Sequence, residues 1–498
     1  MHFSHLSILP LLLPVVSALN THRSTLTDCL NAAEVPILLS SSVGWSEAIE
    51  PFNLRFSPLP NVVVIPRDEH DVEEAVKCAS QSGVKVTIKG GGHSYGAYGL
   101  AGAVILDMVE FQEVTLDTTT NIVRVGAGLR LGNLADTLFN LGERALPHGT
   151  CASVGVGGHA TLGGFGLDSR LWGLLVDTVV QLDVVLPDGS CQSVSATSNP
   201  DLFWALRGAG AGFAVVTTFH FQTLAAPPVN INWAYTYTFP TPSTSADGFL
   251  FASEWAQQYA PKELGYGIVL SPGSLVLRGV YYGSRADYDC IIEPLLVQMK
   301  VLHGGVDPVS SVQELGWIDS LKLLAGGPLV LPPQGDGEHD TFYVKSIATH
   351  EASPFSSNAI LSFFVYLFNA PVPQNSAWFI IINLYGGPGS VITSFPPSTD
   401  PASTSSYAGR DSGYVWQLYG NTPDSTPPFN VAITNYITGM VDALGQEAAD
   451  LPAYAPYADT SYSQSEAQER YWGAGAPRLR EIKSVVDQGG VLYNPQGF

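Results

Sequence analysis

The chain has 498 residues, and its 22 Lys and Arg against 44 Asp and Glu give a formal net charge of −22 at pH 7. A charge of this sign repels polyanions, which excludes nucleic acid and an anionic membrane surface as partners. Hydrophobic residues make up 45% of the chain and charged residues 13%, so wholesale disorder is excluded and the core can serve two or three domains. The 50 Gly and 35 Pro favour a loop-rich α+β body over a helical bundle.

The first 18 residues have the features of a secretory signal peptide. Their apolar centre at 6–16 is short, contains Pro10 and Pro14, and is followed by small residues that end at Ala18. No later run has the ~18 unbroken apolar residues that a membrane-spanning helix needs. We therefore expect a secreted protein whose mature chain begins near residue 19. A buried N-terminal strand or helix is the alternative interpretation.

From residue 61 the chain alternates short strands and helices. Apolar runs bounded by turn residues predict strands at 61–66, 84–89, 103–108 and 122–128. Apolar residues at helical spacing predict helices over 68–83 and 131–142. Gly142 marks the end of the second helix. This order is typical of an α+β unit that carries its glycines at strand ends.

The next stretch begins with a glycine-dense segment at 149–173. A strand follows over 179–186 and ends in a Pro-Asp-Gly turn, and a short helix is predicted within 201–210. After Thr223 the composition changes. The proline-bearing segment 224–233 indicates a domain boundary near residue 228.

Beyond this boundary the pattern becomes richer in strands. Runs of β-branched and aromatic residues predict strands at 233–239, 275–283 and 378–387, with helical stretches between them. The segment 396–430 is dominated by Pro, Ser and Thr and is predicted to be a loop. One helix is predicted over 465–487, near the C-terminus.

The five cysteines are an odd number for an oxidising compartment. Cys29 and Cys78 flank the first folded stretch and are the preferred disulfide. Cys151 lies among small residues and close to two histidines, a setting that suits chemistry better than packing. Cys191 and Cys290 lie in strand-like, partly apolar contexts and are expected to be buried thiols.

Two glycine-dense loops carry unusual reactive residues. The first runs over 89–94 and ends at His93 and Ser94, and the second runs over 149–166 and contains Cys151 and His159. Glycines let a ligand come close to the backbone and leave N–H groups to hold anionic phosphates. The pair of loops therefore indicates a pyrophosphate held by backbone amides. The alternative is that these glycines serve only turns and bulges.

Three other motifs are weaker. Gly92-His-Ser-Tyr-Gly96 matches the G-x-S-x-G turn of serine hydrolases, but a glycine-broken strand follows where that turn needs a helix. The G-A-G runs at 126–128 and 208–210 lack the third glycine of a nicotinamide-dinucleotide site. His148 and His159 are eleven residues apart, without the spacing of a metal site, so no metal is expected.

Longer motifs carry a resemblance to a known family. They are P-x-x-x-x-D-V at 66–72, V-T-I-K-G-G-G-H-S-Y at 86–95 and G-T-C-x-x-V-G-V-G-G-H-x-x-x-G-G-x-G at 149–166, with further matches at 170–173, 177, 187–189, 201–208, 471–473, 478–479, 482–483 and 494–496. This pattern resembles the flavoprotein family of berberine bridge enzyme. Within that family it is most similar to the secreted fungal oligosaccharide oxidases of the glucooligosaccharide and chitooligosaccharide type.

The resemblance implies an α+β fold with two domains, of the vanillyl-alcohol-oxidase or PCMH type. After the signal peptide at 1–18, an FAD-binding domain would occupy 19–227, with its core at about 58–227. A substrate-binding domain at 228–450 would be an antiparallel sheet backed by helices. The C-terminal segment 451–498 would return to the FAD domain.

The resemblance also implies FAD held by two covalent bonds. His93 would bond to the 8α-methyl carbon and Cys151 to C6 of the flavin ring. The further residues that the resemblance assigns to cofactor binding are Gly90, Gly91, Gly92, Ser94, Val154, Gly155, Gly157, Gly158, His159, Asn494 and Gln496. Val154 matches a family position that controls access of oxygen to the flavin, and its small side chain favours an oxidase with O2 as acceptor.

For catalysis the resemblance points to three residues. Tyr457 matches the tyrosine that takes the substrate proton, and Tyr95 matches a tyrosine that lines the substrate site. Asn383 stands where the glucooligosaccharide enzymes carry an acid that assists the tyrosine. The implied reaction oxidises an alcohol or hemiacetal carbon, with the reducing end of an oligosaccharide as the first expected substrate.

Three other functions stay open. Asn383 and the apolar strand around it favour a secondary metabolite as an alternative substrate for the same chemistry. A serine hydrolase that uses Ser94 belongs to another enzyme class and would be colourless. A flavin-carrying binding protein without catalytic activity would be yellow and would show no reduction with any donor.

Overall fold

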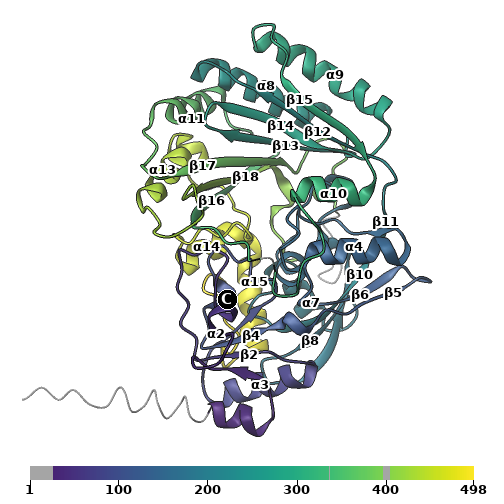
Figure 1. Cartoon of the computed structure of the whole chain (residues 1–498), viewed down its shortest axis with the longest axis vertical. Coiled ribbons are helices and arrows are strands. Elements are labelled where there is room, and N and C mark those ends of the chain that lie inside the picture. Colours follow the sequence, from purple (N-terminus) through teal and green to yellow (C-terminus); the bar gives the residue numbers. More distant parts are fainter. Residues whose placement is uncertain (1–25, 336, 396–403) are drawn as a thin grey trace, which may run out of the picture.

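The computed structural model describes residues 26–335, 337–395 and 404–498. The predicted signal peptide at 1–18 therefore lies outside the described residues. Two groups of sheets are stacked along the long axis of the molecule (Figure 1), with the N-terminal sheets in the lower group and the strands from β12 onward in the upper group. No helix within the described ranges is long and apolar enough to cross a membrane.

A four-stranded sheet with the order β1-β2-β4-β3 lies at the N-terminal end. Its strands are β1 (Ile37–Leu38), β2 (Val62–Val64), β3 (Val86–Lys89) and β4 (Val104–Asp107), and α2 (Trp45–Ala48) and α3 (Glu69–Gln81) accompany it. β2 and β3 both run parallel to β4, with α3 as the crossover between them. The Asp68 carboxylate accepts the N–H of Asp71 and caps α3. The predicted helix over 68–83 is confirmed, because its apolar face packs into the sheet.

A five-stranded antiparallel sheet follows in the order β5-β6-β10-β8-β9. Its strands are β5 (Val114–Asp117), β6 (Ile122–Gly126), β8 (Val179–Val185), β9 (Cys191–Ser195) and β10 (Val215–Gln222), with β7 (Arg144–Ala145) and β11 (Leu224–Ala225) as a separate pair. The helices of this part are α4 (Leu131–Gly142), α5 (Val156–Thr161), α6 (Ser169–Trp172) and α7 (Pro200–Ala209). The predicted helix over 131–142 is confirmed in full as α4. The glycine-dense segment contains the unexpected helix α5, because Val156 and Ala160 are buried in the core and hold it in place.

The upper group is one antiparallel sheet of seven strands in the order β15-β12-β14-β13-β17-β18-β16. The strands are β12 (Asn230–Tyr237), β13 (Leu264–Ser271), β14 (Ser274–Tyr281), β15 (Val309–Leu315), β16 (Phe342–His350), β17 (Ala377–Leu384) and β18 (Ser412–Asn421). The accompanying helices are α8 (Pro242–Tyr259), α9 (Arg285–Leu302), α10 (Trp317–Ala325), α11 (Ser357–Asn369), α12 (Val391–Ser394) and α13 (Ala432–Asp442). The strands predicted at 233–239, 275–283 and 378–387 are confirmed as β12, β14 and β17.

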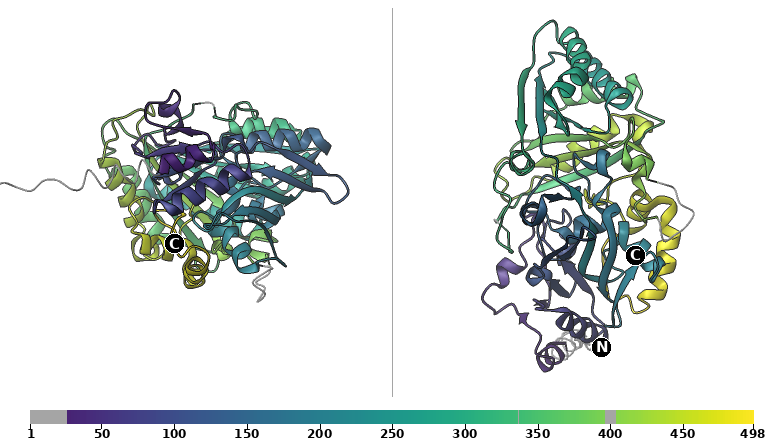
Figure 2. Two further views of the ribbon diagram at one scale, coloured as in Figure 1. Left: turned by 90° about the horizontal axis from the view of Figure 1, so that it is seen from below. Right: turned by 90° about the vertical axis from the view of Figure 1, so that its right-hand side faces the viewer.

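The two faces of this sheet have different surroundings. Ile268 pairs with Leu277 and Ile382 on its two neighbouring strands, and all three side chains enter the core under α8, α9, α11 and α13 (Figures 1 and 2). The next position along β13 is Gly267, which pairs with Arg278 and Asn383. Because side chains alternate along a strand, Arg278 and Asn383 lie on the opposite face. That face points toward the N-terminal sheets.

Two predicted elements near the C-terminus were wrong. The predicted loop at 396–430 contains β18 over 412–421, which is buried between β16 and β17, so tertiary pairing overrides the loop-like composition around it. Residues 396–403 of that loop lie outside the described residues. The single helix predicted over 465–487 is divided into α14 (Gln464–Trp472) and α15 (Ala476–Val486). Gly473 has a positive φ, and Pro477 opens the second helix.

The C-terminal segment packs against the N-terminal sheets. Leu479 and Ile482 of α15 share a core with Leu202 and Leu206 of α7, and the N–H of Tyr493 donates to the carbonyl of Val86 on β3 at 2.8 Å. The right view of Figure 2 shows these yellow helices beside the lower sheets. The domain limits at 227/228 and 450/451 stay predictions. Within the described residues, 3₁₀ turns are η1 (Tyr98–Leu100), η2 (Met108–Glu110), η3 (Leu175–Thr178), η4 (Gly409–Asp411), η5 (Gly445–Ala448) and η6 (Gly473–Gly475).

The structure confirms the predicted disulfide and contradicts the prediction of two buried thiols. Cys29 and Cys78 form the predicted disulfide, with 5.7 Å between their Cα atoms. Cys191 and Cys290 are both exposed, contrary to the expectation of buried thiols. Cys191 lies on edge strand β9, where the Cys191 Sγ donates to Glu73 at 2.7 Å, and Cys290 lies on the outer face of α9. An apolar sequence context did not distinguish these outward positions from core positions.

Candidate active site

One cavity of about 370 Å³ lies between the glycine loops, the inner face of the seven-stranded sheet and the C-terminal segment. Every residue predicted to bind the cofactor or to act in catalysis lines it: Gly90, Gly91, Gly92, His93, Ser94, Tyr95, Cys151, Val154, Gly155, Gly157, Gly158, His159, Asn383, Tyr457, Asn494 and Gln496. Segments more than 300 residues apart thus meet at a single space. Their roles there stay predictions.

The two glycine loops touch each other at Gly91 and Gly155. A Cβ atom on either residue would overlap the backbone of the other, so only glycine allows this approach. Arg130, which is 5% exposed, bridges the same loops, because its Nη1 donates to the carbonyl oxygens of Gly91 and Ser153. The contact and the bridge place His93 and Cys151, which lie close to them in sequence on the two loops, at one cavity.

His93 is held on two sides. The ring of Phe52 stacks on it with 3.7 Å between centroids and 24° between planes. Its Nε2 lies 3.1 Å from Ser153 Oγ. Ser94, the candidate nucleophile of the hydrolase alternative, instead accepts the N–H of Tyr98 at 3.0 Å, and the turn η1 follows where a helix would be required. The site therefore lacks the strand-turn-helix geometry of a serine hydrolase.

Cys151 and His159 are uncharged at neutral pH. Cys151 exposes its side chain into the cavity, where burial by the surrounding protein and the nearby Glu338 carboxylate raise the pKa of its thiol. Burial, with a smaller effect of His148, lowers the pKa of His159 to about 3. His159 Nε2 accepts the N–H of Gly149 at 3.0 Å, so this imidazole braces the loop that carries Cys151.

Tyr457 belongs to a group of aromatic side chains over the cavity. Its ring lies parallel to that of Tyr95, with 6.1 Å between centroids, and edge-on to that of Tyr454 at 5.0 Å. Tyr95 OH accepts a hydrogen bond from Gln417 Nε2 at 2.9 Å. Burial raises the pKa of Tyr457 well above its usual value, and neighbouring Tyr95 raises it further. Tyr457 is therefore a neutral phenol at neutral pH.

Among the described residues, the Oδ1 atom of Asn383, the predicted partner of Tyr457, makes no hydrogen bond to the tyrosine. Asn383 is 5% exposed, and its Oδ1 is buried without a hydrogen-bond partner among the described residues. On the other side of Gly267 lies Arg278, which sequence analysis missed. Its Nε is likewise buried without a partner in the described part of the chain, and its charge lowers the pKa of Tyr457. Only the pairing of β13 with β14 and β17, which no local motif reveals, brings these residues together.

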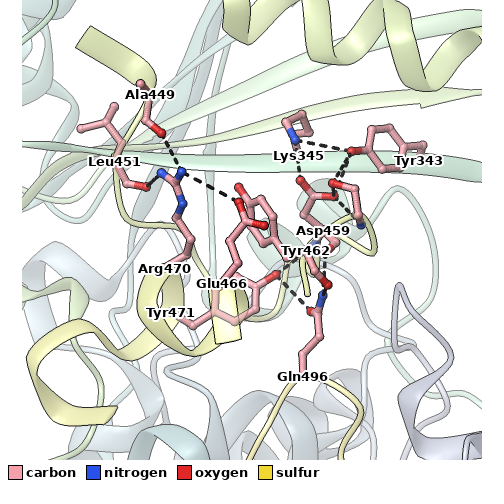
Figure 3. A network of polar contacts seen from close by, with 11 residues as sticks. Tyr343, Lys345, Ala449, Leu451, Asp459, Tyr462, Glu466, Arg470, Tyr471 and Gln496 are labelled. Atoms are coloured by element: carbon pink, nitrogen blue, oxygen red, sulfur yellow. Dashed lines mark hydrogen bonds and ion pairs between the residues drawn. The ribbon is translucent and has the colours of Figure 1, made fainter. Parts of the chain in front are cut away.

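The segment that carries Tyr457 is fixed by a network around Asp459 (Figure 3). Asp459 is fully buried, and its carboxylate accepts hydrogen bonds from Lys345 at 2.6 Å and from the Tyr343 hydroxyl at 2.9 Å. Its backbone N–H donates to Tyr471 OH, and its carbonyl accepts from Gln496 Nε2. Both strand β16 and the C-terminal tail therefore hold the tyrosine in place. Gln496, predicted to bind the cofactor, uses its amide for this purpose.

The lining fits the FAD that the sequence predicts. The position of a Cβ on Gly158 has no atom within 4 Å, so the second glycine loop leaves room for a group against its backbone. No Asp or Glu is among the described residues that line the cavity, which suits an anionic pyrophosphate in an otherwise acidic protein. A thiol and an imidazole face the same space from separate loops. Arg278 Nε and Asn383 Oδ1 have no hydrogen-bond partner among the described residues, so they can bond to a ligand in the cavity.

Comparisons with known proteins support the assignment of an FAD site to this chain. Residues 60–195 match the family described as FAD binding domain, and residues 449–498 match the family described as berberine and berberine like. The chain is 35% identical to the xylooligosaccharide oxidase of Thermothelomyces thermophilus, over 97% of this chain and 96% of the relative. It is 34% identical to the glucooligosaccharide oxidase of Sarocladium strictum, over 95% of this chain and 94% of the relative.

A solved structure resembles the whole molecule. It is the glucooligosaccharide oxidase from Acremonium strictum, described as containing a 6-S-cysteinyl, 8α-N1-histidyl FAD. The two structures superpose with a TM-score of 0.88 at 33% sequence identity, over 95% of this chain and 98% of the other.

We predict that two glycines of the second loop respond differently to the same substitution. Gly155→Ala forces the loops apart and should lower the free energy of unfolding by about 1–3 kcal/mol. Gly158→Ala meets no atom of the protein, so it should not lower that free energy, and it should lower the FAD content because Gly158 lines the cavity. Urea unfolding and the flavin-to-protein absorbance ratio measure the two effects. Full FAD content in Gly158→Ala would contradict the assignment of FAD binding to the backbone of this loop.

Proposed function

The chain belongs to the berberine-like family of FAD-linked oxidoreductases, and on this premise we propose that it is a secreted oligosaccharide oxidase with FAD attached to His93 and Cys151 and with O2 as acceptor. The cofactor is FAD. The observation that carries the proposal is the single cavity onto which His93, Cys151 and Tyr457 open together with Arg278 and Gln417. The relatives named above are oxidases of xylo- and glucooligosaccharides, and this supports the substrate class.

The two attachment residues position the cofactor. His93 and Cys151 come from loops that touch, so bonds from both would fix one flavin ring without a lid over it. Backbone N–H groups of the glycine loops would hold the pyrophosphate. When bound, FAD accepts a hydride from the carbon that bears the substrate hydroxyl group. The protein supplies the position and the electrostatic environment for that transfer.

The substrate would occupy the part of the cavity below the seven-stranded sheet. Tyr95 and Tyr457 present ring faces on which a sugar can lie, and Arg278 and Gln417 offer hydrogen-bond donors for hydroxyl groups. Binding in this position brings the reacting hydroxyl to the Tyr457 oxygen. The small side chain of Val154 lines the same cavity beside Cys151, which supports access of O2.

Proton transfer in this chain differs from that of a carboxylate-assisted tyrosine. The substrate hydroxyl gives its proton to Tyr457, which must first be a phenolate. Asn383 cannot accept the phenol proton, because an amide oxygen is a very weak base. Arg278 is the described cation that lowers the pKa of Tyr457, against the opposing effect of burial. The base is therefore active in the small phenolate fraction, which increases with pH.

Secretion rests on two observations. The segment 1–18 has the features of a signal peptide. Cys29 and Cys78 form a disulfide, a bond that persists in oxidising compartments.

A second candidate substrate is a secondary metabolite. Asn383 in place of an acid favours it, as does Ile381, an apolar residue that lines the cavity from the same strand. Chemistry and cofactor would be unchanged.

A panel of donors tests the substrate class. We expect release of hydrogen peroxide with xylo-, cello- or chitooligosaccharides, and a loss of about 100-fold in kcat for Tyr457→Phe at unchanged flavin content. Tyr366→Phe, which removes a hydroxyl that donates to Tyr436 O and does not line the cavity, is the matched control and should keep the rate. If the wild-type protein releases no hydrogen peroxide with any oligosaccharide of the panel, the secondary metabolite is the favoured substrate. Equal rates for Tyr457→Phe and wild type would contradict the role of Tyr457.

The attachment of FAD is tested by acid precipitation. Wild-type protein should keep its yellow colour in the precipitate, because two covalent bonds survive denaturation. His93→Ala and Cys151→Ala should each keep it through the remaining bond, whereas the double variant should release FAD into the supernatant. Absorbance at the flavin band in pellet and supernatant measures the result. Release of FAD from denatured wild-type protein would show that neither bond exists.

The pH dependence of the reductive step tests the role of Asn383. Because burial raises the pKa of Tyr457, the rate of flavin reduction by substrate should rise with pH, by about tenfold per unit below that pKa. Asn383→Asp supplies a carboxylate that accepts the phenol proton, so its rate should be higher at pH 7 and its profile flatter. Asn232→Asp changes a buried asparagine of the same sheet that does not line the cavity, and should keep the wild-type slope. An Asn383→Asp profile identical to that of wild type would contradict this role.

A further inference from the structure

A chain of hydrogen bonds leads away from His93. His93 Nε2 lies 3.1 Å from Ser153 Oγ, and Ser153 Oγ donates to Glu338 Oε2 at 3.3 Å. Ser153 is 5% exposed and Glu338 is exposed, so the chain of hydrogen bonds leads from the interior to the surface. Phe52 stacks on the imidazole and fixes the plane of the ring. The arrangement has the form of an imidazole, a hydroxyl and a carboxylate in series.

The segment that carries Glu338 is anchored to the same region. Arg130, which bridges the two glycine loops, also donates through Nε to the carbonyl of Pro333 at 3.1 Å. On the other side of Glu338, the N–H of Asp340 donates to the carbonyl of Phe52 at 2.9 Å. The residue that orients the imidazole plane and the segment that supplies the carboxylate are thus bonded to each other. Hydrogen bonds on both sides of Glu338 therefore hold the imidazole, the hydroxyl and the carboxylate in their relative positions.

The hydrogen bond from Ser153 to Glu338 favours one tautomer of His93. The Ser153 hydroxyl has one hydrogen, and it is donated to Glu338. Ser153 Oγ therefore accepts a hydrogen from Nε2 of His93. In the neutral ring the proton lies on Nε2, and Nδ1 carries the lone pair. Nδ1 is accordingly the atom that can act as a nucleophile.

We propose that Ser153 and Glu338 are positioning residues for the attachment of FAD to His93, which hold the imidazole with Nδ1 toward the flavin and take up the Nε2 proton as Nδ1 forms its bond. The inference rests on the proposed function. In the net reaction a C–H bond of the 8α-methyl group and the imidazole N–H are lost and an N–C bond forms. The two protons and two electrons leave with O2, which becomes hydrogen peroxide. Without an acceptor for the Nε2 proton the alkylated imidazole would keep a positive charge at a position that is only partly exposed to solvent.

The same carboxylate acts differently on the second attachment residue. Glu338 raises the pKa of the Cys151 thiol and so disfavours the thiolate, which is the reactive form. Removal of its charge should therefore slow attachment at His93 without slowing attachment at Cys151. Different effects on attachment at His93 and at Cys151 would distinguish proton transfer through Ser153 and Glu338 from a general loss of folding.

The test uses Ser153→Ala and Glu338→Gln as purified, FAD-containing proteins. Proteolysis followed by mass spectrometry measures the fraction of His93 peptide and of Cys151 peptide that carries flavin, immediately after purification and during incubation in air. We expect attachment at His93 to become about 100-fold slower in both variants, the size of a lost proton acceptor. Attachment at Cys151 should be unchanged or faster. Ser153→Thr and Glu338→Asp keep the hydroxyl and the carboxylate, and should restore attachment at His93.

Glu50→Gln is the matched control. The Glu50 carboxylate lies 3.5 Å from His339 Nε2, next to Glu338 in sequence, and its removal should leave attachment at both sites unchanged. Wild-type His93 peptide without flavin would contradict the proposed function itself. Wild-type rates in Ser153→Ala and Glu338→Gln would overturn the relay alone. Parallel loss at His93 and Cys151 would also overturn it, in favour of a purely structural role.

Discussion

The close contact between Gly91 and Gly155 is the constraint on which the site depends. Two loops separated by about sixty residues of sheet and helix approach until their backbones touch, and a side chain on either glycine would prevent this. Arg130 maintains the contact by bonding to both loops and to the segment that carries Glu338. An imidazole and a thiol that are distant in sequence therefore open onto one cavity. Any function that uses both of them requires this contact first.

Burial then determines the chemistry that the cavity supports. It keeps His159 neutral, and it raises the pKa values of the Cys151 thiol and the Tyr457 phenol. A cavity lined by neutral groups and two basic residues, Lys89 and Arg278, suits an anionic cofactor and an uncharged substrate. The same burial raises the free energy needed to ionise the Tyr457 phenol, and Asn383 offers no carboxylate that could accept its proton. Arg278 opposes the effect of burial, so the pKa of this tyrosine reflects a balance between one cation and the buried surroundings of the phenol.

The sequence was sufficient for local elements and for motif residues, but it was insufficient for contacts across the fold. Helix α4 follows from the apolar spacing and the terminal glycine alone, and the glycine loops identified His93 and Cys151. Arg278 and Gln417 could not be found in this way, because they reach the cavity only through the register of the seven-stranded sheet. Strand β18 was missed because its burial between two strands outweighs the composition of its flanks. The Lys345–Asp459 pair joins residues 114 positions apart, a contact without a local signal.

In the proposed enzyme, His93 and Cys151 hold one and the same FAD. Proteolysis of the denatured wild-type protein, followed by mass spectrometry of flavin-containing fragments, tests it most directly. We expect one cross-linked species that contains the His93 peptide, the Cys151 peptide and a single FAD. Two separate peptides that each carry their own flavin, or flavin-free peptides from both loops, would contradict it.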